Sequence, residues 1–222
     1  MANQPKAAEA DPESSLFLLI DFSDSYYSDK SKPTLQSVLN MGRRAVVDLG
    51  QKIPTPIAIS YLSIGEISLQ SPPLCTTVYE PVLIGQPKPG VIRTKKRLTE
   101  FLDQCRDIAL RQRAKRTTDI SGAIIQATEM AAGQRRGPKL IVIASDMYEH
   151  RGVEGELPKL SLKGFRFALI YRVLPQDAVN PGVLQQRLDA WKNRLTLSGA
   201  QKVVTCIETA DCAPIIAREL AP

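Results

Sequence analysis

The sequence predicts an α/β fold: a doubly wound, mostly parallel sheet with one antiparallel edge strand and helices on both faces. Short apolar runs alternate along the chain with segments whose apolar residues recur at helical spacing. The runs are continuously apolar, which is typical of parallel strands buried on both faces of a sheet. Strands that alternate with helices in this way favour right-handed crossovers and a parallel sheet. The chain has 222 residues, 43% hydrophobic and 23% charged, as in ordinary globular proteins.

The first half of the chain is expected to contain three strands. The first is Leu16–Phe22, a continuous apolar run. Apolar residues at helical spacing follow from Leu35 and predict a helix that ends near Gly50. Ile57–Ile64 is the second strand, and Thr76–Ile84 is expected to pair antiparallel with it at the sheet edge. The stretch Gly85–Gly90 is predicted to be a loop.

The second half is expected to alternate helices with three further strands. An amphipathic helix comes first, and its apolar stripe consists of Leu98, Phe101, Leu102, Cys105, Ile108 and Ala109. A second helix is predicted over Ile120–Ala132. The strands are Lys139–Ala144, Phe165–Val173 and Val203–Ile207. Between the last two, Leu184–Leu195 carries apolar residues at spacings that predict another helix.

Residues 1–14 are rich in Ala, Pro and Glu and are expected to form a flexible N-terminal tail, with residues 15–222 as a single domain. No stretch approaches the ~20 apolar residues that span a bilayer, and the start lacks the layout of a secretory signal. We therefore expect a cytoplasmic protein. Cysteines stay reduced in that compartment. Without a CxxC pair, the four cysteines are expected to be small, reduced core residues: Cys75, Cys105, Cys206 and Cys212.

Polar residues gather where predicted strands end, and in a doubly wound sheet this edge is where function lies. Asp21–Ser25 follows the first strand, Ser145 and Asp146 follow a later one, and Thr117–Asp119 precedes a helix. Carboxylates and hydroxyls, without histidine or thiolate, are hard oxygen ligands suited to Mg²⁺, Ca²⁺ or Mn²⁺. The alternative is that these Ser and Asp side chains cap the helices that follow.

Three segments, in order, resemble motifs of the von Willebrand factor A domain family. Asp21–Ser25 is similar to the D-x-S-x-S sequence of that family's metal-ion-dependent adhesion site. Thr118–Ile124 resembles its second motif, a threonine followed five and six residues later by a small and an apolar residue. Thr118 rather than Thr117 keeps this spacing. Leu140–Asp146 is similar to the third motif, a buried strand that ends in aspartate.

The resemblance covers about residues 15–215 and implies the Rossmann-like fold of that family, with one Mg²⁺ or Mn²⁺ ion at the strand ends. It implies that two hydroxyls bind the ion directly, two carboxylates bind it directly or through water, and a threonine joins in one state. The five ligands would be Ser23, Ser25, Asp21, Asp146 and Thr118. An acidic side chain of a partner would fill the open position. The resemblance thus implies an intracellular binding or scaffold module that engages a partner protein.

The sequence departs from the family pattern at three positions where glycine is common: Asp24, Thr117 and Met147. Asp24 adds negative charge that could tighten metal binding, or it points to solvent. Tyr26 and Tyr27 lie beside the expected site. As exposed aromatics they would suit a partner-binding rim, and packing on the first helix is the alternative.

The net charge of +6 comes from one segment. Val91–Lys139 contains 12 Lys and Arg against 5 Asp and Glu, a local net charge of +7. Such a run is most often a solvated helix face, and the alternatives are an acidic protein partner or nucleic acid. A nucleic-acid-associated component that uses residues 91–139 is therefore the second functional hypothesis. The candidate contacts are Arg113, Lys115 and Arg116.

The sequence does not favour an enzyme. It contains no GxxxxGK[ST] motif, and its one histidine, His150, lies in a predicted loop. A strand that ends in Asp21 resembles haloacid-dehalogenase phosphatases, whose second aspartate lies two residues further along. Ser23 stands at that position, and a neutral hydroxyl is a poor general acid or base.

Overall fold

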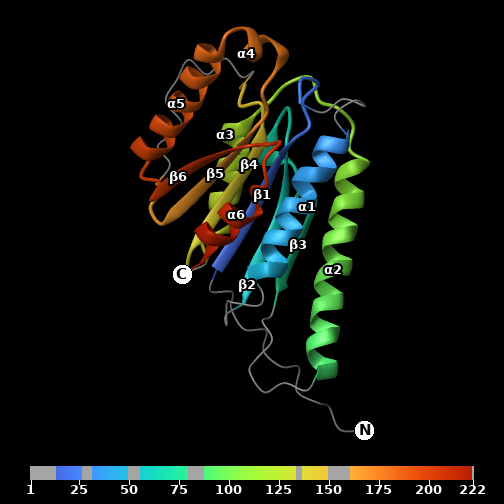
Figure 1. Cartoon of the computed structure of the whole chain (residues 1–222). Coiled ribbons are helices and arrows are strands. Elements are labelled where there is room, and N and C mark those ends of the chain that lie inside the picture. The colour runs from blue at the N-terminus through green and yellow to red at the C-terminus, as the bar shows by residue number, and fades with distance from the viewer. Residues whose placement is uncertain are drawn as a thin grey trace.

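A six-stranded sheet lies between two layers of helices in the computed structural model of the chain (Figure 1). The structure describes residues 14–26, 32–49, 56–79, 88–133, 137–149 and 161–221. The strands are β1 (Ser14–Asp21), β2 (Ile57–Ile64), β3 (Cys75–Tyr79), β4 (Lys139–Ser145), β5 (Phe165–Tyr171) and β6 (Lys202–Ile207). The helices are α1 (Lys32–Leu49), α2 (Lys88–Leu110), α3 (Ile120–Met130), α4 (Pro175–Val179), α5 (Pro181–Leu197) and α6 (Ala213–Leu220), with a 3₁₀ turn η2 (Ser68–Gln70). None of these described helices is both long and apolar enough to cross a membrane.

The strand order is β3-β2-β1-β4-β5-β6, so the order reverses between β1 and β4. Leu16 of β1 pairs with Ile59 of β2 on one side and with Leu140 of β4 on the other. All described strand pairs are parallel except β2 with β3, which is antiparallel and places β3 at the sheet edge. The predicted fold class is therefore confirmed.

Side chains of β1 alternate between two apolar cores, as the two-residue period of a strand requires. Leu16, Leu18 and Ile20 pack in the core beneath α1, α2 and α6. Phe17 and Leu19 pack in the opposite core, which α3 and α5 cover. Figure 1 shows α1, α2 and α6 on the near face of the sheet and α3 behind it. Because both faces are covered, every residue of β1 is buried, which explains the apolar run from Leu16 to Ile20 within it.

Most predicted strand boundaries agree with the structure to within two residues. The end of the predicted edge strand, beyond Tyr79, lies outside the described residues. The predicted tail also lies outside them, except that Ser14 already belongs to β1. The loop predicted over Gly85–Gly90 is wrong in its last three residues, because α2 begins at Lys88. A helix can begin here because proline is tolerated in a first helical turn, where its missing N–H has no partner. No element was predicted for α4 or α6.

The apolar stripe of α2 is confirmed at Leu98, Leu102, Cys105 and Ala109, which are all buried. Ile108 is an exception, since 39% of its surface is exposed. The helix ends at Leu110, beyond the edge strand that covers its middle turns, so the last turn leaves this side chain uncovered.

The prediction of reduced cysteines is wrong. Cys75 at the start of β3 is bonded to Cys105 of α2, with the two Cα atoms 5.8 Å apart. Cys206 of β6 is bonded to Cys212, with the Cα atoms 6.0 Å apart. Sequence spacing could not reveal the first bond, because its partners are 30 residues apart and become neighbours only when α2 packs on the sheet edge. By loop-closure entropy, this bond stabilises the folded state by about 3–4 kcal/mol.

Candidate functional site

Three polar segments meet at the carboxyl ends of β1 and β4, where the strand order reverses. Asp21 is the last residue of β1, and Asp146 directly follows β4. The third segment, residues 115–119, joins them because Lys115 forms a parallel bridge with Ser23. The structure thus brings together the three motifs that the sequence singled out. We call this edge of the sheet the rim.

Asp21 is fully buried, and its carboxylate is held from two sides. Oδ1 accepts a hydrogen bond from the Ser23 N–H at 2.7 Å, and Oδ2 accepts one from the Ser145 hydroxyl at 2.6 Å. Burial raises the pKa of Asp21 to about 7, against the opposing effect of these hydrogen bonds, and the nearby charge of Asp146 raises it further. The orientation of Asp21 is therefore fixed while its charge is left uncompensated.

Asp146 is also fully buried, and half of its carboxylate has no partner. Oδ1 accepts a hydrogen bond from the Tyr148 N–H at 2.9 Å, whereas Oδ2 has no hydrogen-bond partner in the structure. Neither Asp146 nor Asp21 forms an ion pair with a described residue. A buried carboxylate oxygen without a partner costs free energy, about 1–3 kcal/mol or more for a charged group. This orphaned oxygen is what a bound cation would satisfy.

The residue after Asp146 adopts a conformation that favours glycine. Met147 has φ of +64°, and its side chain is buried in the core beneath α3 and α5. Its carbonyl accepts a hydrogen bond from the Trp191 indole N–H at 2.9 Å. A non-glycine residue in this region of φ is uncommon, and packing offsets the backbone cost. Met147 thus adopts the left-handed backbone conformation that the glycine common in the family would adopt without strain.

The hydroxyl groups lie on the solvent side of the carboxylates. The Oγ atoms of Ser23 and Ser25 are 3.1 Å apart, with Ser23 buried and Ser25 exposed. Their loop is held in place by the neighbouring segment, because the Lys115 N–H donates to the Phe22 carbonyl and the Asp24 N–H donates to the Lys115 carbonyl. The adjacent hydroxyls therefore connect a buried position with an exposed one. Asp24 itself is exposed, as one of its two sequence interpretations expects.

The rim fits a hard divalent cation by its donor chemistry. Among the described residues, no group of three or more His, Cys, Asp or Glu side chains could hold a metal ion. A metal would therefore depend on two carboxylates together with hydroxyl oxygens, the set suited to Mg²⁺ or Mn²⁺. Thr118, the remaining predicted ligand, is buried in the segment that joins Lys115 to α3. The residues of the chain that would hold the ion are Asp21, Ser23, Ser25, Thr118 and Asp146.

Helix capping, the alternative reading of these polar residues, applies to Asp119. Its Oδ1 accepts a hydrogen bond from the Gly122 N–H at 2.9 Å at the start of α3, and its Oδ2 accepts one from the Ser68 N–H at 3.0 Å. A Cβ atom at Gly122 would lie 2.2 Å from Asp119 Oδ2, so glycine is required there. Asp21 and Asp146 instead accept N–H groups two residues ahead, within their own loops.

Tyr26 does not lie on the surface of the rim. Only 1% of its surface is exposed, so the prediction of a direct partner contact is wrong. Its ring packs in the same core as Leu35 of α1, and the guanidinium of Arg172 lies 4.2 Å from the ring centroid. Packing on the first helix, the alternative interpretation, is the one that the structure supports. Tyr27 lies outside the described residues.

Sequence reasoning missed two residues, Arg172 and Glu208, that hold the loop after β1 in place. Arg172 follows β5, and its Nε donates to Glu208 at 3.0 Å while Nη1 donates to the Tyr26 carbonyl at 2.5 Å. Glu208 follows β6. Both residues could have been found from the sequence. Functional residues are expected at the carboxyl end of every parallel strand, and this rule pointed to Asp21 and Asp146.

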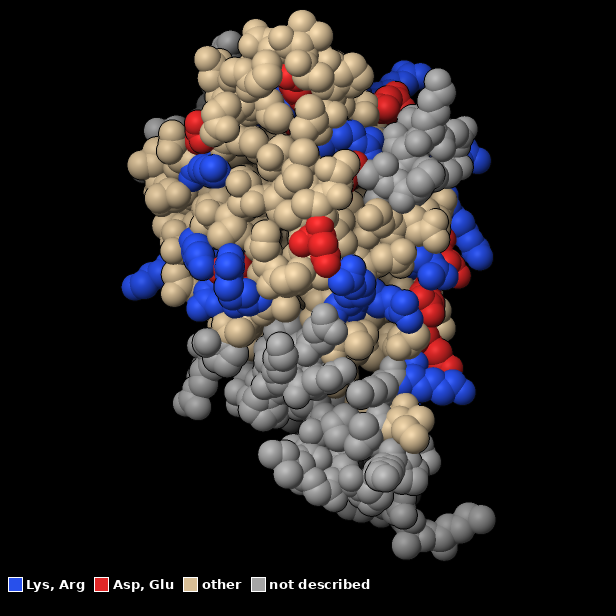
Figure 2. Space-filling view, viewed as in Figure 1, with Lys and Arg blue, Asp and Glu red and all other residues tan. Residues whose placement is uncertain are grey.

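Among the described side chains of residues 91–139, acidic partners separate some of the positive charges. On α2, Lys96 pairs with Glu100 at 3.7 Å and Arg106 pairs with Asp103 at 3.2 Å. Figure 2 shows basic atoms at several separate places on one face, with acidic atoms beside many of them. Arg135 and Arg136 lie outside the described residues.

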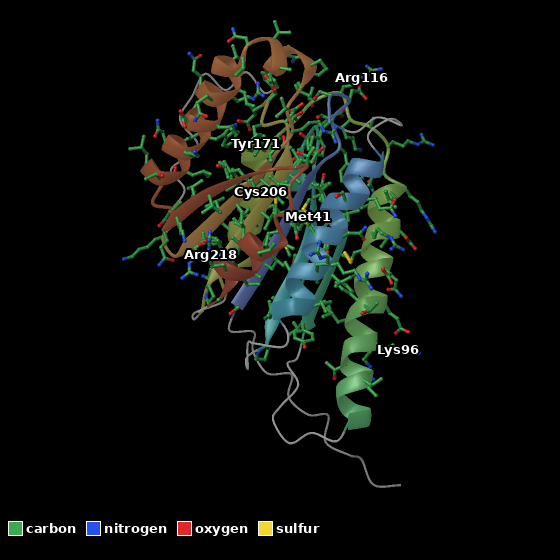
Figure 3. The ribbon with its side chains drawn as sticks, in the orientation of Figure 1. Met41, Lys96, Arg116, Tyr171, Cys206 and Arg218 are labelled. Atoms are coloured by element: carbon green, nitrogen blue, oxygen red, sulfur yellow. A yellow bond between two sulfur atoms is a disulfide. The ribbon has the colours of Figure 1, made fainter. Side chains whose placement is uncertain are left out.

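The three predicted contact residues of this segment lie next to the rim. Arg113 and Arg116 are exposed and Lys115 is half-buried. Figure 3 shows Arg116 at the same upper end of the molecule as the loop after β1. None of the three forms an ion pair with a described residue, unlike Lys96 and Arg106 of α2. These charges are therefore available to a ligand of the rim.

Several solved structures resemble this fold, among them a von Willebrand factor type A protein. The von Willebrand factor type A protein from Catenulispora acidiphila matches with a TM-score of 0.52 and 13% identity, over 94% of this chain and 43% of that chain. BatB from Bacteroides thetaiotaomicron matches with a TM-score of 0.48 and 16% identity, over 92% and 96%. The manganese-loaded TRAP protein of Plasmodium vivax matches with 0.40 and 15%, over 72% and 57%. No family model and no curated protein matches the sequence.

The similarity to the Catenulispora protein concerns the fold alone, because the sequences are only 13% identical. The chain spans 43% of the length of that protein. The match nevertheless covers almost all of this chain, and the sheet has the mixed, mostly parallel form that the sequence motifs implied. The chain has the fold of the von Willebrand factor A domain.

Proposed function

We propose that the chain is a binding module that engages a partner protein through a divalent cation held at the rim. The observation that carries this proposal is the pair of fully buried carboxylates, Asp21 and Asp146, that have no cation among the described residues. Charges are rarely buried in proteins unless they are paired or coordinate a metal. A cation from solution would supply the missing partner for both.

When bound, Mg²⁺ or Mn²⁺ would offer an open coordination position to an acidic side chain of the partner. The residues of the chain prepare that site. Ser145 orients Asp21 by its hydroxyl hydrogen bond, and the Tyr148 N–H orients Asp146. The hydroxyls of the buried Ser23 and the exposed Ser25 lie side by side, and the partner would approach from the side of Ser25.

The other functional predictions have less support. No observation in the structure favours nucleic acid over protein, since the basic residues are partly neutralised on α2. We keep the proposal that the chain is not an enzyme, because the rim contains carboxylates and hydroxyls and no described group that is placed as a general base for a bound substrate.

The cellular location also stays a proposal. The sequence favours the cytoplasm, whereas two disulfides are typical of oxidising compartments. Alkylation of freshly lysed cells, followed by mass spectrometry, decides between them. Free thiols at Cys75 and Cys105 before any reduction step would support the cytoplasm, and protected cysteines would contradict it.

Co-purification tests the proposed function. Wild-type protein is used as bait in Mg²⁺, beside Asp21→Ala and the control Asp107→Ala, which changes an exposed aspartate on α2. We expect one partner that is released by chelator, absent with Asp21→Ala and retained with Asp107→Ala. A partner that binds equally to all three proteins in the presence of chelator would contradict the proposal.

A further inference from the structure

A hollow of about 490 Å³ lies beside the rim, between two walls. One wall is the connection between β2 and β3, residues 65–74, and the other is the last turn of α2 with the loop that follows it. The residues that give it its character are Ile67, Pro72, Pro73, Leu74, Ile108 and Lys115. We call this hollow the groove.

The groove has an apolar lining that is open to solvent. Ile67 is 47% exposed and Ile108 is 39% exposed, and they belong to different walls. Pro72 and Pro73 are also exposed, and Leu74 is half-buried with its side chain packed against the core. Single exposed apolar residues are ordinary, but apolar groups that line both walls of one hollow mark a binding surface.

The end of the groove toward the rim is basic. Lys115 lines it, and Arg111, Arg113 and Arg116 are exposed on the same segment. None of these four cations forms an ion pair with a described residue. Glu66 is the one acidic residue among those that line the groove. The charge therefore favours an acidic occupant.

The groove is continuous with the rim through Lys115. The backbone of this residue bonds to both Phe22 and Asp24, in the loop that carries the candidate metal-binding hydroxyls. A chain segment that lies in the groove and crosses Lys115 would therefore reach Ser23 and Ser25. Apolar side chains would occupy the groove, and acidic side chains would meet the cations and the rim.

The walls of the groove are fixed before any ligand binds. The Cys75–Cys105 disulfide joins the residue after Leu74 to α2, three positions before Ile108. The wall formed by residues 65–74 is also held internally. The Ser68 hydroxyl accepts a hydrogen bond from the Gly65 N–H at 3.1 Å. Gln126 of α3 donates to the Ser71 carbonyl. Such preorganisation lowers the entropic cost of binding.

We propose that the groove binds an extended segment of a partner protein in which acidic residues adjoin apolar ones. The proposal rests on the proposed function in one respect: it takes the partner of the rim to be the occupant of the groove as well. It adds the chemistry of that partner, which the rim alone does not specify. The apolar residues contribute affinity, and the acidic residues set the direction of the segment across Lys115.

The test uses a displayed library of random peptides, selected on the full chain in Mg²⁺. We expect the selected peptides to combine acidic with apolar residues. Their affinity should fall about tenfold or more in the double variant Ile67→Ser with Ile108→Ser, and also in Lys115→Met. Ile92→Ser is the matched control, because Ile92 is a 66% exposed isoleucine of α2 outside the groove. It should bind like wild type.

Two further readings separate the groove from the metal site. Calorimetry with Mg²⁺ should be unchanged in the double variant Ile67→Ser with Ile108→Ser. If wild type binds no metal but the peptides still depend on Ile67 and Ile108, the proposed function fails and the groove proposal stands. If metal binds but the selected peptides are insensitive to both isoleucines, the groove proposal is overturned and the proposed function stands.

Other outcomes also overturn the groove proposal. One is a selection that yields no peptide, or only peptides without acidic residues. Another is binding of a single-stranded oligonucleotide that depends on Arg113, Lys115 and Arg116 but not on Ile67. That result would assign this surface to nucleic acid.

Discussion

Two pairs of buried carboxylates among the described residues differ in their partners, and the difference between them is informative. Asp177 on α4 pairs with Arg187 of α5 at 2.7 Å, and Glu219 of α6 pairs with Lys202 of β6 at 2.8 Å. At the rim, Asp21 and Asp146 are equally buried but pair with no described cation. Asp177 and Glu219 thus have their counter-charge within the chain. Asp21 and Asp146 have none among the described residues, and the proposed cation site rests on this difference.

The pKa of Asp21 is shifted in the opposite direction from those of Asp177 and Glu219. Burial raises the pKa of Asp21 to about 7. Burial also disfavours the charged form of Asp177, yet hydrogen bonds from Arg187 and the Leu174 N–H outweigh it and lower the pKa of that carboxyl. The pKa of Glu219 is lowered in the same way, against burial, by Lys202 and Arg218.

The largest expected effect comes from a substitution that leaves a further buried carboxylate, outside the rim, without its cation. Arg187→Met should lower the free energy of unfolding by about 3–5 kcal/mol, because Asp177 would be left buried without its bidentate partner. Urea unfolding at neutral pH measures this change. The control is Lys192→Met, which removes a half-buried and loosely paired cation of the same helix. Equal stability of the two variants would show that a buried carboxylate here needs no cation, and would remove the contrast with the rim.

A smaller effect of opposite sign is expected at the rim. Asp21→Asn should raise the free energy of unfolding of the metal-free protein by about 1 kcal/mol, because it removes a buried charge that has no counter-charge. The amide can keep a hydrogen bond with both Ser23 and Ser145. Urea unfolding in the presence of a chelator measures this change in the free energy of unfolding. A loss of stability comparable to that of Arg187→Met would mean that Asp21 is a structural residue.

The smallest effect concerns Glu219, whose partner Lys202 is half-exposed. Lys202→Met should cost less than about 1 kcal/mol at neutral pH, since solvent screens the pair and Arg218 also contacts Glu219.

The sign of the pH dependence follows from the lowered pKa of Glu219 and Asp177. The stability that a depressed carboxyl pKa contributes is complete above the unfolded-state value, about 4, and is lost as pH falls through the folded value. As pH falls, the free energy of unfolding should therefore decrease less in Lys202→Met than in wild type. A steeper acid loss in the variant would contradict the assignment.

The sequence predicted the sheet well because its strands are buried on both faces. A residue such as Leu18 must be apolar on whichever side it points, so the runs stand out. The rim could be predicted for a related reason: Asp21 and Asp146 interrupt these runs at the strand ends. The burial of Tyr26 and the exposure of Ile108 could not be predicted, because each depends on contacts with distant segments, such as that of Arg172 with the Tyr26 ring.

The disulfides and the groove depend on contacts between segments that lie far apart in the sequence. Cys75 and Cys105 become neighbours only through the packing of α2 on the edge strand. Lys115 appeared in the sequence as one of many cations, and its pairing with the loop after β1 gives it a position beside the rim. Short-range patterns contain no information on either contact.

Calorimetric titration of the metal-free protein with Mg²⁺ and Mn²⁺ tests the central claim most directly. The titration is run above the Asp21 pKa of about 7, so that the carboxylate is ionised. We expect one ion to bind to wild type and to Asp107→Ala, with the affinity lowered about tenfold to a hundredfold or more in Asp21→Asn and in Asp146→Asn. Absence of binding to wild type at millimolar metal, or undiminished binding to both rim variants, would contradict the account.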